Sequence, residues 1–244
     1  MAEEVARVAI VTGGSRGIGR AVTEALLGRG FRVYFCSKSP ESVEKARAEL
    51  AARFGDDRVG GGPVDVRREE EVEAFVRRVL ERAGRIDCLV NNAGMGIFAP
   101  VDEITGDQFR EVLETNLHGA FYFLRAVAPA MKRQGAGWIV NVSSLAGKNP
   151  LAGGGAYNAS KFGLIGLSEA AMLDLRHHGV RVAAILPGSV ETAFSHPTGH
   201  PSGRKERDWA LRPEDVAMTV LHLLDYPDRA LPSLIELRPS RPPK

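Results

Sequence analysis

Three side chains in the second half of the sequence, Ser144, Tyr157 and Lys161, are of types that together could move a proton. Tyr157 and Lys161 stand four positions apart in the segment AYNASKFG, so on a helix they share one face. A free tyrosine has a pKa of about 10, and a nearby ammonium is expected to lower that pKa. Tyr157 could then serve as a general acid or base. The bare spacing is equally typical of a surface tyrosine beside a solvated lysine.

Ser144 closes the segment NVSS, which continues the apolar run GWIVNV. A hydroxyl at this point could hydrogen-bond a substrate oxygen and stabilise the charge that develops on it. The alternative is an ordinary serine at the end of a strand. We expect the neighbouring Ser143 to support the turn.

The elements that must position these residues are short apolar runs that alternate with helical stretches. Apolar residues recur at helical spacing from Ile18 to Leu26 and from Val72 to Leu80, and Ser39 and Pro213 are good helix starts. The predicted strands are RVAIVT, FRVYFC, RIDCLVNN, GWIVNVSS, VRVAAILP and SLIEL, with the glycine-rich RVGGGPVDV in the remaining place. This alternation predicts an α/β fold, with a parallel sheet that helices cover on both faces.

A glycine-rich loop, TGGSRGIG at residues 12–19, joins the first predicted strand to the first helix. Glycines allow a tight turn and a close approach of the backbone, and the amino end of a helix attracts phosphate. The spacing is G-x-x-x-G-x-G, and no G-K-[ST] follows, so a dinucleotide site is favoured over a triphosphate loop. A tight turn without a ligand is the alternative.

The motifs together resemble those of the short-chain dehydrogenase/reductase family, in the family's order and across nearly the whole chain. They are TGGSRGIG, NNAG at 91–94, Asn116 in TNLHGAF, NVSS, YNASK and PGSVET at 187–192. The resemblance implies one Rossmann-type domain, a doubly wound parallel sheet, over residues 1–244. It also implies hydride transfer between the nicotinamide of NAD(H) or NADP(H) and a carbonyl or alcohol.

The resemblance also implies roles for single residues. Ser144, thirteen residues before Tyr157 as in the family, would act with Tyr157 and Lys161. Asn116 would hold a helix irregularity that positions a water on Lys161. The implied cofactor-binding residues are Gly13, Ser15, Arg16, Gly17, Ile18, Gly19, Ser37, Lys38, Asp65, Val66, Asn92, Ala93, Gly94, Tyr157, Lys161, Pro187, Gly188, Val190 and Thr192. Asp65 could equally cap the helix that follows it.

The end of the second predicted strand favours NADP(H) over NAD(H). An NAD site places a carboxylate there for the ribose hydroxyls, and that carboxylate would repel a 2′-phosphate. This chain has Ser37 at the position, with Lys38 beside it and Arg16 in the glycine loop. The alternative is that both cations are solvated surface charges.

The substrate is less defined than the cofactor. A loop over residues 194–209 is expected to cover the substrate, with Met95, Phe98 and Leu145 as apolar walls. A 3-oxoacyl-carrier-protein reductase is an alternative, but the C-terminal SLIELRPSRPPK departs from the glycine-rich ending usual in those enzymes. A catalytically idle NADP-binding sensor is the alternative from another class. It would not need the serine, tyrosine and lysine together.

Composition and charge indicate which classes of binding partner to expect. The formal net charge is +2 and the basic residues are scattered, so neither a nucleic acid nor a membrane surface is expected. No apolar run approaches the ~18 residues of a membrane helix, and we expect a cytoplasmic protein. His196 and His200 lack a third ligand, so no metal is predicted. By resemblance, the helices around 107–133 and 157–177 would pair across a two-fold axis in a homo-oligomer, and we expect a tetramer.

Overall fold

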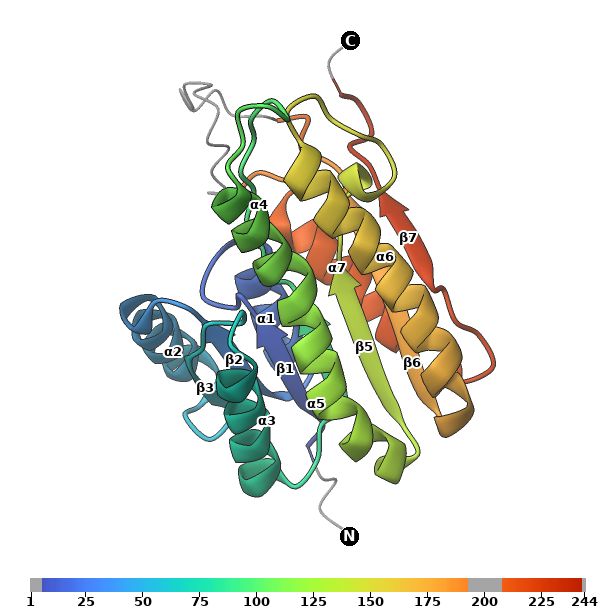
Figure 1. The fold of residues 1–244 in the computed structure, drawn as a ribbon. Helices are drawn as coiled ribbons and strands as arrows, with labels where there is room; N and C mark the ends of the chain where they lie inside the picture. Colours follow the sequence, from blue (N-terminus) through green and yellow to red (C-terminus); the bar gives the residue numbers. More distant parts are fainter. Residues whose placement is uncertain (1–5, 193–207, 243–244) are drawn as a thin grey trace, which may run out of the picture.

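The computed structural model describes residues 6–192 and 208–242. Within them, seven parallel strands form one sheet in the order β3-β2-β1-β4-β5-β6-β7 (Figure 1). The strands are β1 (Val8–Thr12), β2 (Arg32–Ser37), β3 (Val59–Pro63), β4 (Cys88–Asn91), β5 (Gly137–Val142), β6 (Val180–Pro187) and β7 (Leu234–Leu237). Every predicted strand is therefore confirmed, and the fold is the predicted Rossmann-type sheet.

The glycine-rich strand β3 is explained by its neighbour β2. A Cβ on Gly60 would lie 2.4 Å from the ring of Tyr34, and one on Gly61 would lie 2.2 Å from the carbonyl oxygen of Phe35. Only glycine can approach β2 so closely, which is why this edge strand lacks the usual branched side chains.

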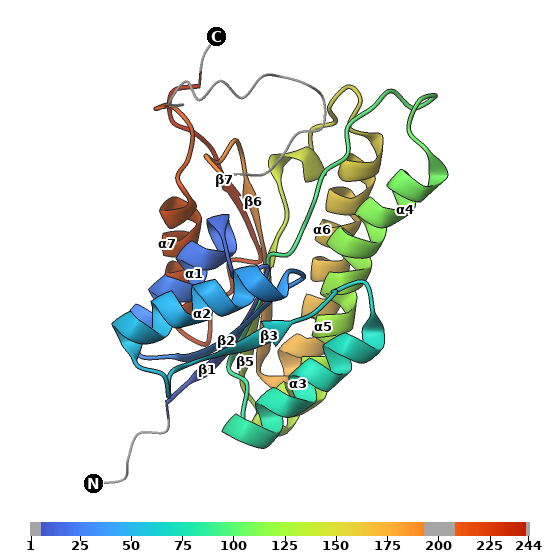
Figure 2. The same ribbon diagram turned by 90° about the vertical axis from the view of Figure 1, so that its left-hand side faces the viewer.

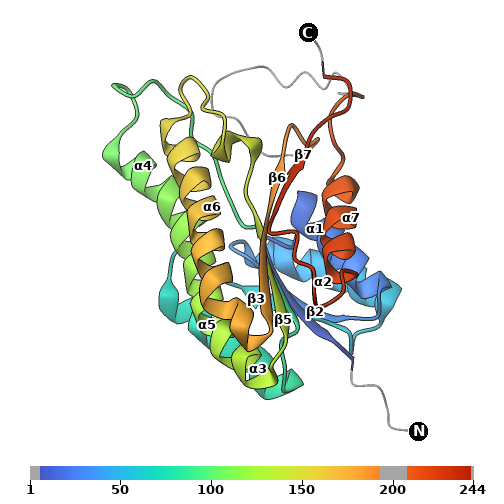
Figure 3. The same ribbon diagram turned by 90° about the vertical axis from the view of Figure 1, so that its right-hand side faces the viewer.

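Helices cover both faces of the sheet, as Figures 2 and 3 show from opposite sides. The helices on one face are α1 (Gly17–Gly28), α2 (Pro40–Phe54) and α7 (Pro213–Leu224). Those on the other face are α3 (Glu69–Ala83), α5 (Gly119–Gln134) and α6 (Gly155–Leu175). Each face has its own apolar core. The central strands β1 and β5 are buried on both sides, so apart from Thr12 in β1 and Asn141 in β5 their residues are apolar.

Two helix starts follow the sequence signals. Ser39 is the N-cap of α2, where its side chain accepts a hydrogen bond from the amide of Ser42, and Pro40 is the first helical residue. Pro213 is likewise the first helical residue of α7, after the N-cap Arg212. Both predicted starts are confirmed.

The long helix predicted over 107–133 contains a defect. Its first part, α4 (Gly106–Leu113), begins at a capping box of Thr105 and Gln108. The turn Glu114–His118 is then a π-helix, and α5 continues from Gly119. This turn contains Asn116, so the helix irregularity that the resemblance implied there is present. A π-turn inserts an extra residue into a helix, and such turns often occur at functional sites.

A chain of buried amides crosses the sheet between β4 and β5. Asn91 and Asn141 are register partners, and the Asn91 amide donates to Asn141 Oδ1 at 2.9 Å. Asn141 in turn donates to the hydroxyl of Ser168 on α6 at 2.8 Å. The contacts tie the two central strands to a covering helix.

The strand order reverses around β1, which lies between β2 and β4. The arrowheads of β5 and β7 in Figure 1 mark the edge at which the parallel strands end. Ligands of such sheets bind beyond that edge, at the reversal. In the described part of the chain, no helix combines the length and apolarity that a bilayer crossing requires.

Candidate active site

The glycine loop after β1 folds tightly against the end of β2. Gly13 and Gly17 have φ angles of +65° and +55°, a region that favours glycine. The amide of Gly14 donates to Cys36 O at 3.1 Å, and the amide of Ser15 donates to Ser37 Oγ at 3.3 Å. A Cβ on Gly19 would lie 2.3 Å from Gly13 O. The backbone of the loop thus packs directly on the first turn of α1.

The amino end of α1 has the character of an anion site. Its N-cap, Arg16, makes no side-chain capping bond, and the first turn holds no acidic residue. Arg16 is exposed, and so is Lys38 across the loop. The side chain of Ile18 packs against the apolar core, which leaves its backbone amide as its contribution to a ligand. Close backbone packing, the helix amino end and two cations fit a dinucleotide phosphate.

The NNAG segment is fixed to the glycine loop by Thr12, which begins the motif TGGSRGIG but was given no role of its own. Thr12 Oγ1 accepts hydrogen bonds from the amides of Asn92 and Ala93, both at 2.9 Å. The Asn92 side chain donates to Thr12 O at 3.0 Å. A threonine at the end of the first strand was the available signal, but its partners lie 80 residues away.

Three predicted residues from different motifs meet beyond the end of β4. A Cβ on Gly94 would lie 3.3 Å from Asn116 Oδ1 and 3.7 Å from Lys161 Nζ. The Asn116 side chain accepts from the amide of Met95 and donates to its carbonyl oxygen, both at 2.8 Å. It also donates to Ser160 Oγ at 2.9 Å. Asn116 therefore connects the segment after NNAG to α6.

The Tyr157 side chain lies against Ser144, Phe98 and Lys161. Its hydroxyl is hydrogen-bonded to Ser144, whose Oγ accepts from the Ala146 amide at 3.1 Å. The Phe98 ring packs 5.4 Å from the Tyr157 ring, between centroids. Burial raises the pKa of Tyr157 above its usual 10, and the Ser144 hydrogen bond opposes that rise only in part. The predicted lowering of this pKa is wrong for the protein without ligand, because burial outweighs the other effects.

Lys161 is buried behind Tyr157. Its Nζ donates to Val142 O at 3.0 Å and lies 5.8 Å from the centroid of the Tyr157 ring. Burial lowers the pKa of Lys161 to about 8. Ser143 Oγ donates to Lys161 O at 3.0 Å, so this serine ties the residue after β5 to α6.

Asn158, between the tyrosine and the lysine, holds the loop that follows Ser144. Its Nδ2 donates to Ala146 O at 2.6 Å and to Asn149 O at 3.3 Å. Its Oδ1 accepts from the Leu151 amide at 3.0 Å. The sequence did not identify Asn158, because the loop partners of a buried asparagine cannot be read from its neighbours along the chain.

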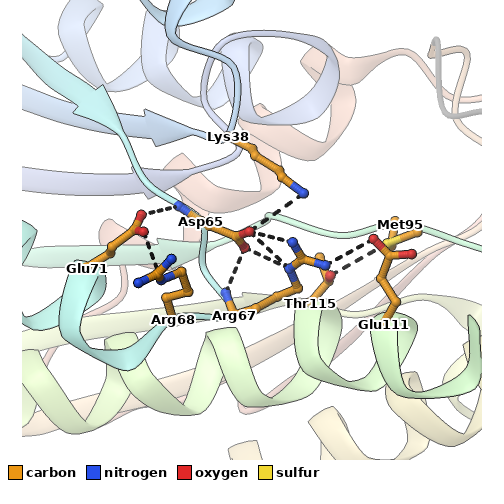
Figure 4. Close-up of polar contacts among 8 residues, drawn as sticks. All are labelled: Lys38, Asp65, Arg67, Arg68, Glu71, Met95, Glu111 and Thr115. Carbon is orange, nitrogen blue, oxygen red and sulfur yellow. Dashed lines mark hydrogen bonds and ion pairs between the residues drawn. The ribbon is translucent and has the colours of Figure 1, made fainter. Parts of the chain in front are cut away.

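The adenosine end of the predicted site contains a cluster of charges (Figure 4). Asp65 does not cap α3, whose N-cap is Arg68. The Asp65 carboxylate instead pairs with Arg67 and lies 3.6 Å from Lys38 Nζ. The guanidinium of Arg67 holds the pKa of Asp65 down to about 2. Val66 is buried against Gly119 at the start of α5.

The PGSVET motif leaves β6 at Pro187 and returns to the glycine loop. The amide of Gly188 donates to Leu237 O at 2.8 Å, and Val190 pairs with Leu211. A Cβ on Gly17 would lie 3.5 Å from Thr192 Cγ2. The motif thus brings the end of β6 to the amino end of α1.

The residues predicted as apolar walls of a substrate site lie within the described part of the chain. Phe98 is buried beside Tyr157, and Leu145 lies beside Gly188. Most of the predicted 194–209 loop, with His196 and His200, lies outside the described residues. Across 6–192 and 208–242, no group of three or more His, Cys, Asp or Glu side chains could hold a metal ion.

The chain is similar to known proteins over nearly its whole length. The family model described as short chain dehydrogenase matches residues 7–202. An uncharacterized oxidoreductase of Staphylococcus saprophyticus is 32% identical over 246 residues, covering 98% of this chain and 100% of that protein.

Two solved structures resemble the chain closely. An alcohol dehydrogenase from the archaeon Thermococcus sibiricus, complexed with 5-hydroxy-NADP, has a TM-score of 0.87 at 32% identity and covers 98% of this chain and 99% of its own. A variant of actinorhodin polyketide ketoreductase, crystallised with NADPH, has a TM-score of 0.88 at 32% identity and covers 98% of each chain.

Proposed function

The chain belongs to the short-chain dehydrogenase/reductase family of oxidoreductases, and from this membership we propose that it is an NADP(H)-dependent enzyme that interconverts a carbonyl and an alcohol. The observation that carries the proposal is the arrangement around Tyr157. Its hydroxyl is hydrogen-bonded to Ser144, and its ring is adjacent to the buried ammonium of Lys161. A structural or interaction protein would have no use for this arrangement at the ligand-binding edge of the sheet.

The family uses nicotinamide cofactors, and such a cofactor, when bound, accepts or supplies hydride at the substrate carbon. Tyr157 donates its phenolic proton to the carbonyl oxygen during reduction and accepts a proton during oxidation. Ser144 hydrogen-bonds the same oxygen and stabilises its developing charge. Lys161, charged below its pKa of about 8, favours the phenolate that Tyr157 forms. Asn116 keeps Gly94 and α6 in place beside Lys161.

Four segments would hold the cofactor. The glycine loop, with Gly13, Ser15, Gly17, Ile18 and Gly19, would take the pyrophosphate at the amino end of α1. Asp65, Val66, Asn92, Ala93 and Gly94 would flank the adenosine. Pro187, Gly188, Val190 and Thr192 would hold the nicotinamide.

The preference for NADP(H) over NAD(H) rests on charge at the end of β2. Ser37 leaves the site without the carboxylate that would bind ribose hydroxyls, while Lys38 and Arg16 supply exposed cations for a 2′-phosphate. The Thermococcus and actinorhodin relatives, whose structures contain 5-hydroxy-NADP and NADPH, support this choice.

The substrate proposed is a small or medium-sized carbonyl compound or its alcohol. A second candidate is a 3-oxoacyl thioester, because the actinorhodin relative is a polyketide ketoreductase. We treat residues 1–244 as one domain with a substrate-covering loop over 194–209. We also propose a cytoplasmic homotetramer that pairs through α4, α5 and α6. Exposed Phe109, Phe121 and Phe162 on these helices support such pairing.

The proposal is tested with a panel of ketones, aldehydes, ketoacids, quinones and 3-oxoacyl thioesters. Turnover of each compound is measured as the loss of NADPH absorbance. Turnover of any carbonyl compound by the parent but not by Tyr157→Phe supports the function. Turnover of the thioester alone selects the second candidate. Cofactor binding without turnover across the panel would favour a sensor.

Light scattering tests the tetramer, and a 26.3 kDa species alone at micromolar concentration would reject it.

A further inference from the structure

The Asp65 carboxylate lies between two cations that come from different parts of the chain (Figure 4). Arg67 contacts both carboxylate oxygens, through Nε to Oδ1 at 2.9 Å and through its terminal nitrogen to Oδ2 at 2.5 Å. Lys38 Nζ is 3.6 Å from Oδ2 on the other side. One acid is therefore shared by a close, bidentate partner and a looser one.

Arg67 is held in this position by two carboxylates, those of Asp65 and Glu111. Its own amide donates to Asp65 Oδ1 at 3.1 Å, and its guanidinium reaches Glu111 of α4 at 3.1 Å. Figure 4 shows the guanidinium between the two carboxylates. The Arg67 side chain is 26% exposed and the Lys38 side chain 67%, so Arg67 is the more constrained of the two cations.

The carboxylate of Asp65 would work against the 2′-phosphate if it were unpaired. It would hold Lys38, and its negative charge would repel the phosphate that Lys38 is proposed to bind. A guanidinium that engages both carboxylate oxygens offsets this charge. Lys38 then loses little when it turns from Asp65 to a phosphate, because an exposed ion pair contributes only ~0–1 kcal/mol.

We propose that Arg67 is a specificity-determining residue that acts through Asp65: it neutralises the acid beside Lys38 and thereby allows the site to prefer NADP(H) over NAD(H). The inference rests on the proposed cofactor preference. It assigns the preference to a residue outside the glycine loop and the end of β2. Arg67 does this as a positioning residue, without touching the phosphate itself.

The neighbour Arg68 provides a matched control. It is one position away and carries the same charge, but its guanidinium pairs with Glu71 at 3.1 Å, whereas the Asp65 carboxylate pairs with Arg67 and Lys38. Loss of Arg68 changes the local net charge by the same amount as loss of Arg67. Only loss of Arg67 exposes the acid beside Lys38.

The experiment measures the dissociation constants of NADPH and NADH by fluorescence titration, in the absence of substrate. Arg67→Gln should lower the ratio of the NADH constant to the NADPH constant by roughly five- to tenfold. Arg68→Gln should leave that ratio within about twofold. The double variant Asp65→Asn/Arg67→Gln should restore it, because the acid is then absent as well. Adenine is common to both cofactors, so any effect of Asp65→Asn on adenine binding cancels in the ratio.

Retained NADH binding shows that each variant is folded. If Arg67→Gln does not fold, the single variant Asp65→Asn tests the inference. Removal of the acid should leave the preference for NADPH equal or higher. A lower preference overturns the inference. Suppose that the parent prefers NADPH, but the ratio is unchanged in Arg67→Gln or does not recover in the double variant. The inference about Arg67 is then overturned, while the proposed cofactor preference stands. A parent without any preference for NADPH overturns the proposed cofactor and the inference together.

Discussion

The Lys161 ammonium lies over the ring of Tyr157, 5.8 Å from its centroid, and donates a hydrogen bond to the backbone of β5. The cation therefore faces the ring, while the phenolic oxygen is hydrogen-bonded to Ser144. Burial raises the pKa of the tyrosine and lowers that of the lysine to about 8, so each group is shifted toward its neutral form. At neutral pH the tyrosine is therefore protonated and the lysine is still charged, so a phenolate formed at Tyr157 would lie beside a cation.

Tyr157→Phe should lose most of its turnover and keep its fold. The ring and its packing on Phe98 remain, while the exchangeable proton is removed, and a positioned acid or base contributes ~10²–10⁴ in rate. Steady-state kcat would be compared with cofactor affinity and Tm, both of which should stay close to the parent values. Near-normal turnover in this variant rules out Tyr157 as the acid or base.

Lys161→Met should remove a pH-dependent part of the stability. The pKa of Lys161 is about 8 in the folded protein and 10.5 in the reference state, so between these values the unfolded chain binds more protons. The stability of the parent relative to the variant should therefore rise with pH, by roughly 3 kcal/mol across the window. Below about pH 8 both states carry the proton, and the full cost of burying the ammonium is present.

Urea unfolding of parent and Lys161→Met at several pH values from neutrality to about 10.5 measures this difference. Titrating groups remote from Lys161 are common to both proteins and cancel. A difference that does not change with pH would show that Lys161 titrates as an ordinary surface lysine.

Asn158→Ala should destabilise the protein and reduce kcat. It leaves the buried acceptor Ala146 O and the donor Leu151 N without this side-chain partner, at a cost of about 1–3 kcal/mol for each unsatisfied group. The loop it holds begins next to Ser144, so the position of that hydroxyl should suffer as well. Asn149→Ala, in the same loop, removes one exposed hydrogen bond and should shift stability by less than about 0.5 kcal/mol. Equal effects of the two substitutions would contradict the role given to Asn158.

Gly19→Ala should weaken both the fold and cofactor binding. Its Cβ would lie 2.3 Å from Gly13 O and 2.5 Å from the Asn92 side chain, so the glycine loop must move, at about 1–3 kcal/mol or more. Gly28→Ala lies in the same helix, and its Cβ would meet nothing within 4 Å. That control should be neutral or stabilise by about 0.5–1 kcal/mol. Thermal unfolding and NADPH titration of both variants compare them, and a stable, cofactor-binding Gly19→Ala protein would refute the close approach.

Ser37→Asp should reverse or erase the preference for NADPH. A carboxylate at the end of β2 would bind ribose hydroxyls and repel a 2′-phosphate, and one charged hydrogen bond alone is worth about tenfold or more in affinity. An aspartate can still accept the hydrogen bond that Ser15 N makes to Ser37 Oγ. The control Ser37→Asn introduces a side chain of the same size as aspartate but without its charge, and it should retain the preference for NADPH. The measurement is kcat/KM with both cofactors, and equal use of both by the parent would reject the assignment.

Most of the fold could be predicted from local pattern. Buried parallel strands leave near-continuous apolar runs, and helix starts such as Ser39 carry their signal within four residues. The strand β3 shows the limit, because its glycines make sense only against Tyr34 and Phe35 of another strand. Its existence followed from the alternation of elements and not from its own residues.

The candidate site was predicted where motifs resemble a family, and missed where contacts depend on the tertiary structure. Thr12 and Asn158 bond to backbone groups whose positions the fold alone determines. The interpretation of Asp65 as a helix cap is wrong for the same reason, since Arg67 and Lys38 take its carboxylate. The pKa of Tyr157 is shifted upward because the side chain is buried, and burial cannot be predicted from the four-residue spacing to Lys161.

The buried amides of Asn91 and Asn141 have a consequence for how the chain finds its native pairing. β4 and β5 are parallel and joined through a long connection, so no tight turn sets which residues align. A slip by one residue would turn the two side chains to opposite faces of the sheet, and a slip by two would separate them along the strands. Either error would break the hydrogen bond between the two amides and leave Asn141 Oδ1 buried without this donor, at about 1–3 kcal/mol. The two asparagines thus penalise misaligned intermediates during folding, at the centre of a sheet whose apolar strands would otherwise tolerate several alignments.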